Sequence, residues 1–63
     1  MLPLALTEKE LTAIEDQLNE ENLLITKFRA YSNVCTDPQL KQKCTSIASK
    51  HQAHYDQLFS FLK

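Results

Sequence analysis

The sequence predicts an all-α fold: two long amphipathic helices form an antiparallel hairpin, and two hairpins dimerise head to tail into a four-helix bundle. The chain of 63 residues contains no glycine and only two prolines, of which Pro3 lies beside the N-terminus. The other proline, Pro38, therefore marks the one strong break between helices. On both sides of it apolar residues recur in steps of three and four, which is the helical period. A lone hairpin this short buries too little apolar surface, so we expect a second chain.

The first helix is expected over residues 8–35, and its start carries clear signals. Thr7 suits the N-cap position, and Glu10, three residues later, completes a capping box. Further along, one face presents a mainly apolar series: Leu11, Ile14, Leu18, Glu21, Ile25, Phe28, Ser32 and Cys35. Because no glycine is available to cap the other end, we expect the helix to fray around residues 34–36.

The turn is expected at residues 36–37 and the second helix at about 38–62. Asp37 can accept hydrogen bonds from the first free N–H groups, and Pro38 suits the first helical position. The inward-facing series of this helix is Leu40, Cys44, Ile47, His51, His54, Leu58 and Phe61. The whole chain is thus predicted to be a single helical-hairpin domain.

Both helices carry an apolar face broader than the seam of a two-stranded coiled coil. Such a face suits a four-helix bundle, in which each helix contacts two neighbours. Residues 1–21 hold six acidic residues and one lysine, whereas residues 22–50 hold five basic residues and one acidic residue. Head-to-tail pairing would set each basic end beside an acidic one, so we expect a homodimer or higher oligomer with a two-fold axis across its length.

Three polar residues interrupt the apolar faces and are expected to meet. Folding at the turn pairs positions whose numbers sum to roughly 73, so Glu21 lies level with His51 and His54. Two interpretations stay open. The three residues form a buried polar layer that fixes the register of the helices, or they bind zinc or another divalent metal, for which a nitrogen-rich donor set is suited. The two-fold axis would bring a second copy of the set to the dimer centre.

Two segments carry a resemblance to a known family. The hinge from Asp37 to Lys41, Asp-Pro-Gln-Leu-Lys, and the run Lys-His-Gln-Ala-His from Lys50 to His54 resemble the short ferritin-like helical proteins related to spore coat protein F of endospore-forming Firmicutes. The resemblance implies a ferritin-like bundle, a structural role near the spore and other coat proteins as partners. Ferritin-like metal sites use Glu-x-x-His on one helix; here His51 replaces that glutamate, which argues against di-iron redox chemistry.

Composition excludes several classes of function. The net charge is −1 and no basic run occurs, which argues against binding to nucleic acid or to an anionic membrane surface. No stretch approaches the roughly 20 apolar residues that cross a bilayer, so we expect a cytoplasmic protein. Cys35 and Cys44 are about two helical turns out of level, so we expect no bridge between them within one chain, whereas a disulfide between chains would require oxidation.

No set of residues resembles a nucleophile with its base and oxyanion donors, so we expect no enzymatic activity. Three hypotheses of function remain. The chain is a structural assembly protein, a metal-binding bundle with a Glu/His site at the dimer centre, or a helical interaction module for another protein.

Overall fold

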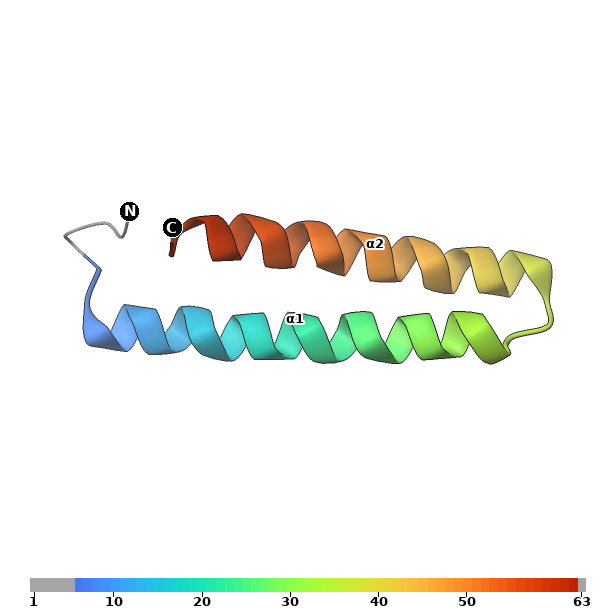
Figure 1. Cartoon of the computed structure of the whole chain (residues 1–63), viewed down its shortest axis with the longest axis horizontal. Coiled ribbons are helices and arrows are strands. Elements are labelled where there is room, and N and C mark those ends of the chain that lie inside the picture. The colour runs from blue at the N-terminus through green and yellow to red at the C-terminus, as the bar shows by residue number, and fades with distance from the viewer. Residues whose placement is uncertain (1–5, 63) are drawn as a thin grey trace.

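The computed structural model describes residues 6–62, and over these residues it is a hairpin of two α-helices (Figure 1). Helix α1 covers Glu8–Val34 and helix α2 covers Pro38–Ser60. They run antiparallel and pack side by side in a rod whose Cα extents are 48 × 15 × 11 Å. The all-α hairpin predicted from the sequence is therefore confirmed. The apolar start at residues 1–5 lies outside the described residues.

Helix α1 begins with the expected capping box. The Thr7 hydroxyl accepts a hydrogen bond from the Glu10 N–H at 3.1 Å, and the Glu10 carboxylate accepts the Thr7 N–H at 3.2 Å. The helix ends at Val34, one residue before its predicted end. Cys35 is already extended, at φ −76° and ψ 129°, while its N–H donates to the Tyr31 carbonyl at 3.0 Å. Without a glycine for a left-handed cap, the chain leaves the helix through extended backbone.

Helix α2 begins where the sequence predicts. One carboxylate oxygen of Asp37 accepts the N–H groups of Gln39 at 2.9 Å and Leu40 at 3.3 Å, and Pro38 occupies the first helical position. The helix ends at Ser60, two residues before the predicted end. There the N–H of Leu62 donates three residues back, to the Phe59 carbonyl at 2.9 Å. The last turn is thus tightened into 3₁₀ geometry, which is common at helix ends because the terminal carbonyl groups lack N–H partners four residues further on.

The core is a single seam between the helices, and its buried apolar residues are few. They are Leu18 and Ile25 from α1 and Cys44 and Ala48 from α2. Ala48 is only 2% exposed, and its small side chain allows the two backbones to approach closely. Cys35 and Cys44 are both free thiols, as expected.

A second row of apolar side chains lies along one side of the hairpin and is only partly covered. Around the axis of each helix, at 3.6 residues per turn, the residues of this row are rotated away from the seam in the same direction. Because the helices are antiparallel, the two sets of residues lie on the same side of the hairpin. Ring contacts agree with this, since Phe28 meets Tyr31 edge-on at 5.8 Å and stacks across to His51 at 6.5 Å. We call this row the side face: Leu24, Phe28, Tyr31, Leu40, Ile47, Leu58 and Phe61.

Neither described helix is long and apolar enough to cross a membrane.

The Asp37 cap provides a test of how α2 is started. Asp37→Ala leaves two backbone N–H groups without their partner, so we expect the free energy of unfolding to fall by about 1 kcal/mol. Asp37→Asn keeps an oxygen at the same place and should lose much less. Urea unfolding followed by far-UV circular dichroism measures both. Equal losses for the two variants would show that the cap does not act through its oxygen.

Candidate metal centre

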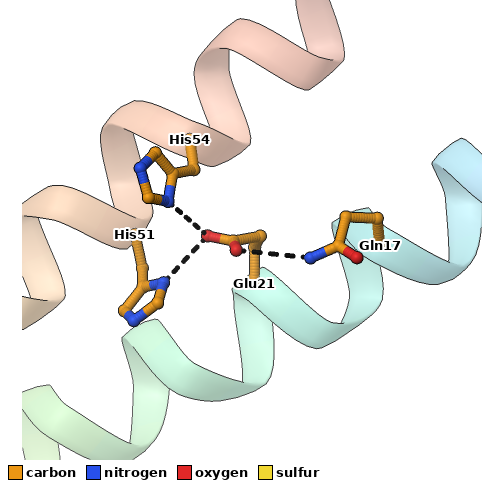
Figure 2. Close-up of polar contacts among 4 residues, drawn as sticks. All are labelled: Gln17, Glu21, His51 and His54. Atoms are coloured by element: carbon orange, nitrogen blue, oxygen red, sulfur yellow. Dashed lines mark hydrogen bonds and ion pairs between the residues drawn. The ribbon is translucent and has the colours of Figure 1, made fainter.

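Glu21 is a buried carboxylate at the middle of α1. Its side chain is only 8% exposed, and a carboxylate removed from water needs donors or positive charge to compensate. Gln17, one turn earlier on the same helix face, donates its Nε2–H to Glu21 Oε1 at 3.4 Å. The other oxygen, Oε2, faces α2 (Figure 2).

Two histidines of α2 meet that oxygen. His51 Nδ1 lies 3.0 Å and His54 Nδ1 3.5 Å from the same atom, Glu21 Oε2 (Figure 2). Residues three apart share one helix face, which is why both rings reach Glu21. The expectation that Glu21 lies level with the two histidines is therefore confirmed. Their exposure differs, since the side chain of His51 is 24% exposed and that of His54 is 59% exposed.

The neighbouring residues fix the orientation of the histidines. The His51 ring stacks on Phe28 of the facing helix, with 16° between their planes, and lies edge-on to His54 at 5.7 Å. Among the described residues every buried side-chain nitrogen or oxygen has a hydrogen-bond partner. Glu21 is thus hydrogen-bonded where it is buried, whereas His54 is 59% exposed in the single hairpin, so the polar layer is only partly buried there.

The same geometry also suits a metal ion. One ligand atom from each of Glu21, His51 and His54 can be chosen so that all three lie within 4.8 Å of one another. Tetrahedral zinc, with Zn–N distances of about 2.0–2.1 Å, holds its ligand atoms about 3.3–3.5 Å apart. The N–O separations of 3.0 and 3.5 Å are close to these values. The group can therefore hold a divalent metal after small movements of the side chains.

Hydrogen bonding and metal binding exclude each other at the Nδ1 atoms. A ring nitrogen that donates a proton to Oε2 has no lone pair for a metal, so metal binding at Nδ1 must displace that proton. Without metal the two rings compensate the Glu21 carboxylate, whereas a bound cation would do so itself. Three protein ligands would leave at least one coordination position of a tetrahedral metal for water or another ligand.

Reasoning from the sequence missed two residues of this site. Gln17 supports Glu21 through Oε1, and Phe28 stacks on His51. The spacing of four between Gln17 and Glu21 is a recognisable signal, because side chains four apart on a helix are neighbours. The stacking of Phe28 had no comparable signal, since Phe28 reads as an ordinary core residue.

Comparison with models of protein families, with curated proteins and with solved structures found no match to this chain. Its function is therefore inferred from its own residues.

Replacing the buried carboxylate tests its contribution to stability. Glu21→Ala removes the acceptor shared by His51 and His54 and leaves a void at the seam, so we expect the free energy of unfolding to fall by roughly 1–3 kcal/mol. Glu20→Ala alters the adjacent, exposed acidic residue and should stay within about 0.5 kcal/mol of the unmodified chain. Urea unfolding in the presence of a chelator measures both. Equal stability of the two variants would contradict a structural role for Glu21.

Proposed function

We propose that this protein is a structural assembly module that pairs with a second copy of itself, head to tail, to form a four-helix bundle. The observation that carries the proposal is the side face, a row of partly exposed apolar side chains contributed by both helices. Tyr31, Leu40 and Phe61 in this row are 45%, 52% and 50% exposed in the single hairpin. A second hairpin laid on this side would cover them.

The weak core of one hairpin supports the need for a second copy. Burying one aliphatic side chain contributes about 1.5–3 kcal/mol, and among the described residues Leu18 and Ile25 are the only large aliphatic side chains that are buried. Ordering a residue costs about 1–2 kcal/mol in backbone entropy alone. The side-face residues are spread along a rod whose length is 48 Å, so a second hairpin laid on them would make contact along both helices.

Charge supports the head-to-tail orientation. Residues 22–50, which include the turn, hold five basic residues, Lys27, Arg29, Lys41, Lys43 and Lys50, against Asp37, whereas residues 1–21 hold six of the eight acidic residues. Antiparallel pairing sets unlike ends together, and parallel pairing sets like ends together. Single exposed ion pairs contribute about 0–1 kcal/mol, so charge selects the orientation while apolar contact supplies the affinity.

For the biological setting we propose a spore-associated layer, with other coat proteins as further partners and no catalytic role. The support is the resemblance of the Asp37 to Lys41 hinge and the Lys50 to His54 run to coat protein F-like sequences. A different protein could occupy the same side face, and the oligomeric state of the purified chain distinguishes the two cases.

A second candidate function is binding of zinc or another late divalent metal by Glu21, His51 and His54. The convergence of one carboxylate oxygen and two imidazole nitrogens favours it. Two nitrogen ligands and one oxygen ligand suit zinc better than magnesium or calcium, which prefer oxygen ligands alone.

Two neighbouring leucines test self-association. Leu24 belongs to the side face, whereas Leu23 lies on the outer side of α1 and is 68% exposed. We expect Leu24→Glu to convert the dimer to monomer, because it would bury a charge at the interface, and Leu23→Glu to leave the dimer intact. Light scattering coupled to size exclusion gives the mass, and circular dichroism checks that both variants remain helical. A purified unmodified chain that stays monomeric at high concentration would overturn the proposal and favour a different partner.

Removal of one histidine tests the metal site. His54→Ala deletes an exposed ligand, so we expect zinc affinity to fall by more than about tenfold, since even outer-shell changes cost 10–100-fold. Gln42→Ala alters an exposed residue on the outer side of the same helix, about two and a half turns before His51, and should bind zinc normally. Isothermal titration with Zn²⁺ and elemental analysis after dialysis measure the binding. No bound zinc in the unmodified chain would remove this candidate function.

A further inference from the structure

The Glu/His group lies at the middle of the hairpin. Helix α1 spans Glu8–Val34, and Glu21 is its central residue. In a head-to-tail dimer that overlaps along its full length, the two-fold axis passes beside the middle of each hairpin. The Glu21–His51–His54 groups of the two copies therefore face each other near that axis. This step depends on the dimer proposed above.

Within one chain the group is an incomplete metal site. It offers three ligand atoms, whereas structural zinc sites have four protein ligands. The ligand residue nearest to solvent is His54, at 59% exposed, while Glu21 is buried behind it. His54 therefore brings the group to the surface of the hairpin, where a second copy can reach it.

We infer that binding of a divalent cation and dimerisation are coupled: the second copy completes the coordination of a cation held by Glu21, His51 and His54. The group on the second copy that can do so is its own Glu/His set, of which His54 is the most exposed member. A cation then binds the dimer more tightly than the monomer. By linkage the cation must tighten the dimer by the same factor.

Charge makes head-to-tail pairing the favoured arrangement for this coupling, and either orientation requires the two copies to be in register. A parallel dimer would also bring the two middles together, but it would place the two acidic open ends side by side, where like charges repel. A partner displaced along the rod would separate the two Glu/His groups by about 1.5 Å for each residue of displacement. A cation at the centre therefore also fixes the register of the two copies.

Sedimentation velocity over a series of protein concentrations tests the coupling, once with saturating Zn²⁺ and once with a chelator. We expect the dimer dissociation constant to be at least about tenfold lower with zinc, within the range of 5–150-fold that is typical of coupled sites. In parallel, zinc titrations should give a higher zinc affinity at protein concentrations above the dimer dissociation constant than at concentrations below it. His54→Ala should keep the dimer formed in chelator and lose the effect of zinc, whereas Gln42→Ala, on the outer side of α2, should retain both.

The outcomes separate this inference from the proposed function. A dimer whose dissociation constant is the same with and without bound zinc overturns the coupling and leaves the assembly proposal standing. A dimer that binds no zinc also overturns it. A chain that is monomeric under both conditions overturns the assembly proposal, and the coupling with it. A chain that dimerises only with zinc supports the coupling in its strongest form.

Discussion

Two helices that lie side by side can remove from water only the residues along one seam, and this limit governs the rest of the structure. Leu18, Ile25, Cys44 and Ala48 are the apolar residues buried there. The other apolar positions of both helices cannot reach the seam, because the helical step of about 100° turns them away from it. Several of them lie on one side of the antiparallel pair and form the side face, whereas others, such as Leu23 at 68% exposed, lie away from both the seam and the side face. The shortage of core and the presence of a binding surface thus have the same geometric cause.

The seam is narrow, and yet it holds a carboxylate. A buried ionisable group seldom adds stability over an apolar residue of the same size, because its desolvation offsets its attraction to a partner. Glu21 is tolerated because His51, His54 and Gln17 all face its two oxygens. An aliphatic residue could pack here at any of several registers, whereas the Glu/His contact is made at one register only. The contact between Glu21 and the histidines thus favours one alignment of α1 with α2, and the same three residues could hold a metal ion.

Assembly and metal binding, as proposed here, share one surface. The Glu/His group begins at the seam with Glu21 and ends at solvent with His54, beside the apolar side chains that a second copy would cover. Phe28 belongs to both features, since it lies on the side face and stacks on His51. If the histidines moved to bind a cation, Phe28 and the interface would therefore change with them. Formation of the interface would in turn change the affinity for the cation.

The sequence by itself determined the two helices, the turn and the meeting of Glu21 with the histidines. Caps and hinge depend on neighbours in the chain, such as Thr7 with Glu10 and Asp37 with Pro38, and equal rise in both helices sets which positions are level. Only the tertiary structure decided that the rings of His51 and His54 both contact one oxygen of Glu21 and that Gln17 donates a hydrogen bond to the other. It also decided that His54 remains exposed. These features depend on side-chain rotamers and on how closely the helices approach at Ala48, and the periodicity of a sequence carries neither.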